Sequence, residues 1–145
     1  MIRRMGYGLA GVTMAAGMLV AGSGSAQAAL PTCTQSLALS YAPRANSYTV
    51  MPGRDGGTTC GLVEGNEGEG VRALQRTLNK CYGSFLDAPL VEDGDFGDKT
   101  RKGLSEVQRA IGVLRTEEYD SATRYKMERR ASKDGTNTFA YCYVP

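Results

Sequence analysis

Histidine and tryptophan are both absent from the 145 residues of the sequence. Without histidine, a serine or cysteine nucleophile lacks its usual general base. A zinc site loses a common ligand, and no C-x-x-C pair replaces it. The lack of tryptophan counts against the aromatic platform on which many proteins stack sugars. We therefore predict that the protein has no catalytic residues, holds no metal and needs no cofactor.

The sequence also lacks a large excess of either positive or negative charge. The sequence has 17 Lys and Arg against 15 Asp and Glu, and two of the basic residues lie in the N-terminal segment described next. Loss of that segment would bring the net charge close to zero. Because a nucleic-acid-binding surface needs an excess of basic residues, we expect no nucleic-acid partner.

Long apolar runs are limited to one, over residues 9–22. Arg3 and Arg4 precede it, and an A-x-A cleavage site at Ala26 to Ala28 follows, which is the order of a secretory signal peptide. The run is too short and too rich in Gly and Ala to span a membrane comfortably. We predict a signal peptide over residues 1–28, export after its cleavage, and a soluble mature chain that does not contact the membrane.

Four cysteines follow the predicted cleavage site, namely Cys33, Cys60, Cys81 and Cys142. An even number of cysteines in a small exported protein predicts two disulfides, and three pairings are possible. Cys81 falls on the apolar face of a predicted helix, and residues 61–69 contain three glycines that would let them fold back along it. This arrangement favours Cys60 with Cys81, and Cys33 with Cys142.

Apolar residues at helical spacing predict three helices. Val71, Leu74, Leu78 and Cys81 share one face of residues 70–82, and Leu104, Val107 and Ile111 share one face of residues 98–111. The two segments align at an offset of 33, so Gln75 and Gln108 correspond, and we expect both amides to make structural contacts. A third helix begins near Asp120 or Ser121, either of which can cap it, and runs to about residue 130.

The remaining segments show little helical periodicity. Residues 29–59 predict an irregular arm with one short strand near residues 48–50, punctuated by Gly and Pro. Residues 132–138 predict a polar loop, and residues 139–144 alternate as a short terminal strand would. We therefore predict a mainly α protein with the arm at 29–59, a three-helix domain at 60–131 and a tail at 132–145.

Residues 93–100, DGDFGDKT, concentrate three carboxylates and two glycines. A calcium loop of the EF-hand type fails here, because its glycine and its last acidic ligand would be misplaced. The carboxylates are crowded into one turn, whereas those of a glycosidase flank a bond from opposite sides. The stretch instead predicts a turn at Asp93 and Gly94, a core anchor at Phe96, and a helix start near Asp98. Residues 116–127 repeat this device at an offset of 23.

Four motifs in order resemble the peptidoglycan-binding domain family, small three-helix modules attached to many bacterial cell-wall hydrolases. They are G-x-x-G-x-x-V-R-A-L-Q-R-x-L-N at 65–79, D-G-D-F-G-x-x-T at 93–100, V-Q-R-x-x-G at 107–112 and Y-x-x-A-T-R at 119–124. The resemblance spans residues 62–127. It implies a compact three-helix fold that binds peptidoglycan without cleaving it.

Two details of the resemblance bear on structure. The second turn of the family is usually D-G-x-x-G-P, but residues 116–121 read T-E-E-Y-D-S. Because both turn glycines are lost, we expect another backbone conformation there. Exported relatives carry C-x-L before the first helix and C-Y-G at its end, which correspond here to residues 60–62 and 81–83. This implies the pairing of Cys60 with Cys81.

Peptidoglycan offers acetylated sugars and short peptides bearing carboxylates, so a binder needs cations, amides and stacking surfaces. We predict a ligand groove between the two turns, lined by Asp95, Arg101, Glu118, Tyr119 and Arg124. The predicted partners are peptidoglycan or muropeptides, bound by a secreted, monomeric, cell-wall-associated protein. A second hypothesis is a secreted protein-binding domain or enzyme inhibitor on the same scaffold, acting through the arm or residues 132–138. A small hydrolase is the third.

Overall fold

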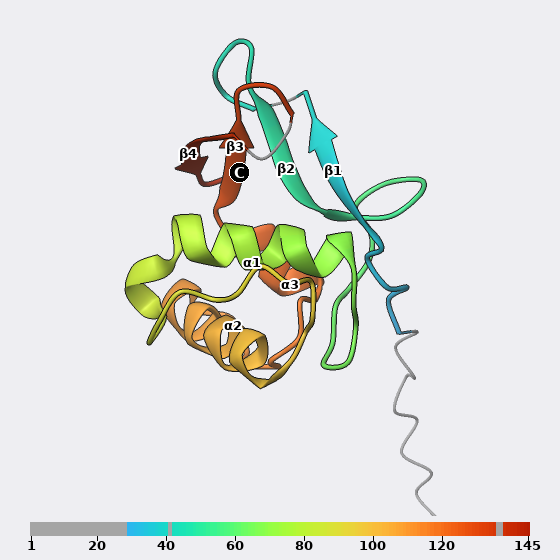
Figure 1. Cartoon of the computed structure of the whole chain (residues 1–145), viewed down its shortest axis with the longest axis vertical. Helices are drawn as coiled ribbons and strands as arrows, with labels where there is room; N and C mark the ends of the chain where they lie inside the picture. The colour runs from blue at the N-terminus through green and yellow to red at the C-terminus, as the bar shows by residue number, and fades with distance from the viewer. Residues whose placement is uncertain (1–28, 41, 136–137) are drawn as a thin grey trace, which may run out of the picture.

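The computed structural model describes residues 29–40, 42–135 and 138–145 (Figure 1). The predicted signal peptide lies outside the described residues. The elements in chain order are β1 (Gln35–Leu39), β2 (Tyr48–Gly53), α1 (Glu69–Cys81), the short 3-10 helix η1 (Gly83–Phe85), α2 (Asp98–Ile111), α3 (Ser121–Lys126), β3 (Arg129–Ser132) and β4 (Phe139–Tyr143). In these parts of the chain, no helix is both long and apolar enough to cross a bilayer.

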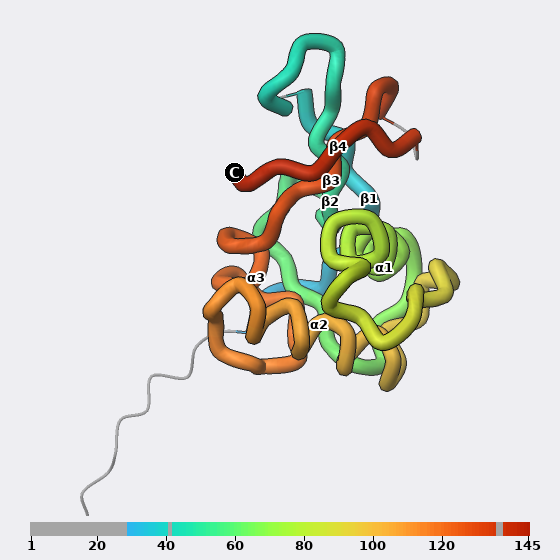
Figure 2. Tube along the Cα trace, turned by 90° about the vertical axis from the view of Figure 1, so that its left-hand side faces the viewer, coloured from blue at the N-terminus to red at the C-terminus, as the bar shows by residue number. Residues whose placement is uncertain are grey.

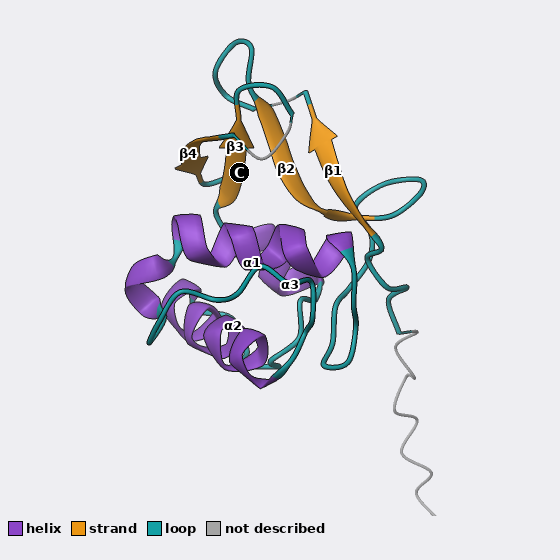
Figure 3. Ribbon diagram, in the orientation of Figure 1, coloured by secondary structure: helices purple, strands orange, loops and turns teal. Residues whose placement is uncertain are grey.

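A four-stranded antiparallel sheet accompanies the three predicted helices, so the prediction of a mainly α fold is wrong (Figure 3). The strands follow the order β1-β2-β3-β4. The arm, predicted to be irregular, supplies β1 and β2. Its partner β3 lies far along the chain, with Thr49 opposite Ala131, and local periodicity does not reveal such non-local pairing. The predicted terminal strand is confirmed as β4.

The third helix is shorter than predicted because the sheet claims the residues that follow it. Asp120 caps α3 as expected, its Oδ1 accepting a hydrogen bond from the backbone N–H of Thr123 at 2.7 Å. Met127 then adopts an extended conformation, with φ −64° and ψ 139°. Arg130, expected near a helix end, lies instead in β3 with 1% of its surface exposed, and this burial lowers the pKa of its guanidinium.

Helix α1 packs against both the sheet and α2. It lies between the sheet and α2 in Figure 1, and the view turned by 90° keeps that arrangement (Figure 2). The predicted apolar face of α1 is buried at Val71, Leu74 and Leu78, and Phe96 anchors the first turn in the core, all with 0% exposure. Burying these side chains contributes roughly 1.5–3 kcal/mol each before entropy is subtracted.

The two disulfides join Cys33 to Cys60 and Cys81 to Cys142, so the predicted pairing is wrong. Residues 61–68 do not fold back along α1. They run between the two turns, as isolated bridges from Leu62 to Tyr119 and from Glu67 to Asp95 indicate. The backbone N–H of Cys33 donates to the Gly61 carbonyl at 2.9 Å, which places Cys33 beside Cys60. Cys81 at the end of α1 is therefore free of Cys60 and pairs with Cys142 of β4.

Candidate functional site

The first turn is built around the amide of Gln75, which is 1% exposed on α1. Its Nε2 donates to Asp93 Oδ1 at 2.8 Å, to the Asp95 carbonyl at 3.0 Å and to Thr100 Oγ1 at 3.2 Å. Its Oε1 accepts from the backbone N–H of Gly94 at 2.9 Å. One buried side chain therefore holds the DGDFGDKT stretch as a turn, as the sequence predicted.

The second turn repeats this arrangement around Gln108, which is fully buried on α2. Its Nε2 donates to Thr116 Oγ1, the Glu118 carbonyl and Thr123 Oγ1 at 2.8–2.9 Å. Its Oε1 accepts from the backbone N–H of Glu117 at 2.9 Å. The structural role expected for both glutamines is confirmed. The expected change of conformation is wrong, because Glu117 takes a left-handed φ of 63° where Gly94 has 80°.

The segment of residues 61–68 pairs with both turns and joins them. Leu62 exchanges two backbone hydrogen bonds with Tyr119, at 3.1 and 2.8 Å. Phe96 donates to the Asn66 carbonyl at 2.9 Å and accepts from Gly65 at 3.0 Å. These hydrogen bonds tie the two turns to one another through residues 61–68.

Arg101, a predicted ligand residue, lies among three carboxylates. Its Nη2 is 2.9 Å from Asp98 Oδ1, its Nε is 3.6 Å from Glu64 Oε2, and its Nη1 bonds to Glu117. Hydrogen bonds to Asp98 and Glu117 raise the pKa of Arg101, and the same contact with Arg101 lowers the pKa of Asp98. Arg101 therefore ties α2 to the second turn and to residues 61–68.

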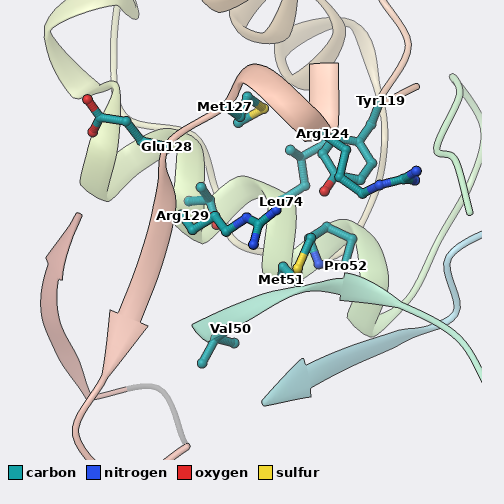
Figure 4. Close-up of a pocket in the computed structure, with 10 residues that line it drawn as sticks. Val50, Met51, Pro52, Leu74, Tyr119, Arg124, Met127, Glu128 and Arg129 are labelled. Carbon is teal, nitrogen blue, oxygen red and sulfur yellow. The ribbon is translucent and has the colours of Figure 1, made fainter. Parts of the chain in front are cut away.

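Arg124 and Tyr119 lie together in a different place. Arg124 Nη1 donates to the Cys60 carbonyl at 2.9 Å, and the Tyr119 side chain is nearly buried. Both line a crevice with Leu74 and with Met51 of β2 (Figure 4). Its volume of about 10 Å³ holds at most one water, so a sugar or peptide does not fit inside it.

The remaining predicted residues, Asp95 and Glu118, are exposed at the tips of the two turns. The structure therefore brings Tyr119 and Arg124 together, and gives Arg101 and Arg124 different hydrogen-bond partners. Of the five predicted residues, Tyr119 and Arg124 line the same crevice.

A larger groove lies between residues 85–90 and α2 and encloses about 470 Å³. Phe85, Leu86, Pro89 and Leu90 line one side, and Lys99, Lys102 and Ser105 line the other. Sequence analysis missed this groove, although the run F-L-D-A-P-L-V at residues 85–91 offered a signal. That run is too apolar for an ordinary exposed loop, and it belongs to no predicted helix.

One contact from α1 and one from α2 hold the loop in place. Asn79 Oδ1 accepts from the backbone N–H of Leu90 at 2.7 Å, and Asn79 Nδ2 donates to the Leu90 carbonyl at 2.9 Å. Gly103 leaves room on α2, since a Cβ there would lie 2.9 Å from Leu86 Cδ2. These contacts fix the position of the loop that forms one wall of the groove.

Some charged side chains along the groove have ion-pair partners, and others do not. Glu106 accepts from Arg109 at 2.9 Å and from Arg115 at 2.8 Å, and these contacts lower the pKa of Glu106. Glu117 bonds to Arg101. Within the described ranges, by contrast, Lys99 and Lys102 are exposed and have no carboxylate within ion-pair distance. The α2 side therefore presents positive charge outside any close ion pair, although Lys102 also helps Arg101 to lower the pKa of Asp98.

One group of metal-ligand type occurs among the described residues. The ligand atoms of Cys81, Glu128 and Cys142 lie within 4.8 Å of one another. Both cysteines are joined in a disulfide, and a metal binds the thiolate form of cysteine. The oxidised protein therefore does not present this set as a metal site.

The described chain is a helical unit with two matching turns, packed against a sheet that carries two disulfides at its margins. Residues 67–127 match the family model of the peptidoglycan binding domain. This match contains α1, both turns, α2 and α3, and it confirms the family resemblance found in the motifs. β1, β2, β3 and β4 all lie outside it. Searches of curated proteins and of solved structures gave no match to the chain.

Proposed function

We propose that the protein is a secreted, non-catalytic module that binds bacterial cell-wall peptidoglycan. The observation that carries this proposal is the match of residues 67–127 to the peptidoglycan binding domain. The groove beside α2 supports it, because ligand sites are commonly concave, mostly apolar and equipped with a few polar groups. Asp95, Arg101, Glu118, Tyr119 and Arg124 remain part of the proposal as candidate contacts at the rims of the turns.

The state of the carboxylates supports binding without cleavage. A general acid needs a raised pKa. Asp93 accepts hydrogen bonds from the Asp95 backbone and from Gln75, which lower the pKa of Asp93. The pKa of Asp98 is lowered by Arg101. Both groups are thus held ionised, which suits a structural role better than proton transfer.

Co-sedimentation with insoluble peptidoglycan tests the proposal. The exported chain, with both disulfides formed, should pellet saturably with the wall material and release neither reducing sugar nor amines. Arg101→Ala and Arg124→Ala variants measure the predicted contacts at the turns, with Arg54→Ala as a matched exposed control. Loss of pelleting in the first two alone would support these contacts. A folded chain that stays in the supernatant would contradict the proposal.

The alternative function is a secreted protein-binding domain or enzyme inhibitor. It is favoured by the open edges of the described sheet at β1 and β4, since an extended peptide can pair with a free edge strand. Deletion of residues 29–59 would be a poor test, because it removes β1, β2 and Cys33 together. Proline substitution of exposed Ala38 in β1 instead blocks pairing at one edge, and it should leave pelleting unchanged if the wall is the partner.

A further inference from the structure

We infer that the groove between residues 85–90 and α2 binds the carboxylate-bearing stem peptide of peptidoglycan rather than its glycan chain. The inference rests on the proposed function and names the part of the polymer that this groove recognises. Its volume of about 470 Å³ falls within the range of about 300–1,000 Å³ found for small-ligand sites. A short peptide therefore fits it.

The charge of the α2 wall favours a carboxylate. Lys99 and Lys102 stand three residues apart, so they project from the same face of the helix. Two acids beside the lysines are already engaged, Glu106 by Arg109 and Arg115, and Glu117 by Arg101. The exposed Asp87 on the opposite wall has no ion pair among the described residues, so the two lysines leave the groove with an excess of positive charge. An entering carboxylate would meet two ammonium groups that have no ion-pair partner among the described residues. Charge-assisted hydrogen bonds of this kind are the strong ones.

The opposite wall favours small apolar groups. Leu86, Ala88, Pro89 and Leu90 line it with short aliphatic surfaces, which suit the methyl side chains of a stem peptide. Peptide amides can run along such a wall while a terminal carboxylate reaches the lysines. The two walls therefore match the two chemical ends of one short peptide.

A glycan fits the same surface less well. Sugar rings are bound by stacking on exposed aromatic faces and by neutral hydrogen-bonding groups. Phe85 is the one aromatic residue on the groove's described lining, and its ring is tilted against Tyr82 with centroids 6.2 Å apart. The Ser105 hydroxyl already accepts a hydrogen bond from Arg115 at 3.0 Å. Phe85 is 44% exposed, so the groove offers a sugar one aromatic face but no free hydroxyl on Ser105.

The test measures binding of three soluble probes to the exported, oxidised chain by calorimetry. They are a stem tetrapeptide with free carboxylates, the same peptide with its carboxylates amidated, and an N-acetylglucosamine oligosaccharide. The free peptide should bind most tightly. Replacement of both lysines in Lys99→Gln/Lys102→Gln should weaken it roughly tenfold. Lys126→Gln/Lys133→Gln, which changes two lysines that do not line the groove, should bind like the parent chain.

Further measurements distinguish failure of this inference from failure of the proposed function. Backbone resonances of Phe85 and Gly103 should shift on adding the free peptide to the parent chain, whether or not a variant folds. If the oligosaccharide binds as tightly as the peptide, or if the lysine variant binds the peptide unchanged, the inference is overturned while wall pelleting still supports the proposed function. If the parent chain neither pellets nor binds any probe, the proposed function fails together with the inference.

Discussion

Glu117 occupies in the second turn the left-handed backbone conformation that Gly94 occupies in the first. Such a φ costs a residue with a Cβ about 1–2 kcal/mol. Two contacts offset that cost, the hydrogen bond from its backbone N–H to Gln108 and the ion pair of its carboxylate with Arg101. The turn keeps the conformation of its counterpart although its glycine has been lost.

Substitutions of Glu117 separate these two effects. Glu117→Ala loses the ion pair and keeps the backbone strain, whereas Glu117→Gly loses the ion pair and relieves the strain. We expect the alanine variant to be less stable than the glycine variant by about 1 kcal/mol, after allowance for the greater freedom of glycine in the unfolded chain. Urea denaturation measures the difference. Equal stability of the two variants would show that the left-handed φ carries no cost here.

Asp93 gives the first turn a dependence on pH. Its carboxylate accepts from the backbone N–H of Asp95 at 2.9 Å and from Gln75 at 2.8 Å, and these bonds lower the pKa of Asp93. A lowered pKa in the folded state contributes stability above the unfolded pKa of about 4. That contribution disappears as the pH falls through the lower folded pKa.

The Asp93→Asn variant isolates this titration, since the asparagine oxygen can still accept both hydrogen bonds. We expect the unfolding free energy of the parent chain to exceed that of the variant at pH 7, and the gap to narrow below about pH 4. Chemical denaturation at several pH values measures the gap. Parallel curves down to about pH 2 would exclude a titrating role for Asp93.

At the scale of elements, the sequence predicted α1 and α2 to within about one residue because their signals are local. Apolar spacing marks both helices, and Gly112 ends α2 with a left-handed φ of 72°. Strands near residues 48–50 and over residues 139–144 were predicted and correspond to β2 and β4, whereas β1 and β3 were not. The sheet escaped prediction because its pairing joins distant residues, as Tyr48 pairs with Ser132. Helix α3 is shorter than predicted because Arg129 and Arg130 pair within the sheet instead of continuing the helix.

Some features of the candidate site could likewise be predicted from the sequence, and others could not. The amides of Gln75 and Gln108 were predicted correctly as structural, because the repeat placed them at equivalent positions facing equivalent turns. The groove was not predicted, because its walls come from η1, an irregular loop and α2. No period in the sequence links Phe85 or Leu86 to Lys102, and only packing through Gly103 brings them together.

The start of α1 offers a test of how closely it approaches the arm. A Cβ at Gly70 would lie 2.1 Å from the carbonyl oxygen of Cys33 and 2.7 Å from its carbon. Gly70→Ala should therefore destabilise the protein by about 1–3 kcal/mol, although alanine favours a helix by up to about 1 kcal/mol. The matched control is Gly83→Ala, because nothing lies within 4 Å of a Cβ there.

Thermal and urea denaturation compare the two glycine variants. We expect a lower melting temperature for Gly70→Ala and little change for Gly83→Ala. If Gly70→Ala were as stable as the parent chain, the contact between α1 and the strand-bearing arm would be loose. Disulfide formation by Cys33 would then not depend on this close approach.

At the scale of the whole molecule, one disulfide, Cys81–Cys142, fastens the sheet to the part that matches the family, and Cys33–Cys60 closes the arm outside that part. Cys33–Cys60 joins the chain before β1 to the segment before the first turn, and Cys81–Cys142 joins the end of α1 to β4. Cys81–Cys142 crosses the boundary of the matched residues 67–127, and Cys33–Cys60 lies outside them. The sheet is thus an addition held to α1 by packing and by one covalent link.

The two bridges differ in their access to solvent, and this difference predicts their order of reduction. Cys33 and Cys60 are 0% exposed, whereas Cys81 and Cys142 are only partly buried. Because thiol–disulfide exchange needs access to a sulfur atom, we expect a mild reductant to open Cys81–Cys142 first. Alkylation followed by mass spectrometry should then label Cys81 and Cys142 before Cys33 and Cys60.

Opening Cys81–Cys142 should loosen β4 without unfolding the helical unit that matches the family. The residues bridged are 61 apart, so the loop-closure model gives a loss of about 4 kcal/mol. Cys33–Cys60 still ties the arm to the segment beside both turns, and the groove beside α2 contains neither bridge. We therefore expect the Cys81→Ala/Cys142→Ala variant to show faster hydrogen exchange in β4 and unchanged pelleting with peptidoglycan. Loss of pelleting by a folded variant would instead make the sheet part of the binding surface.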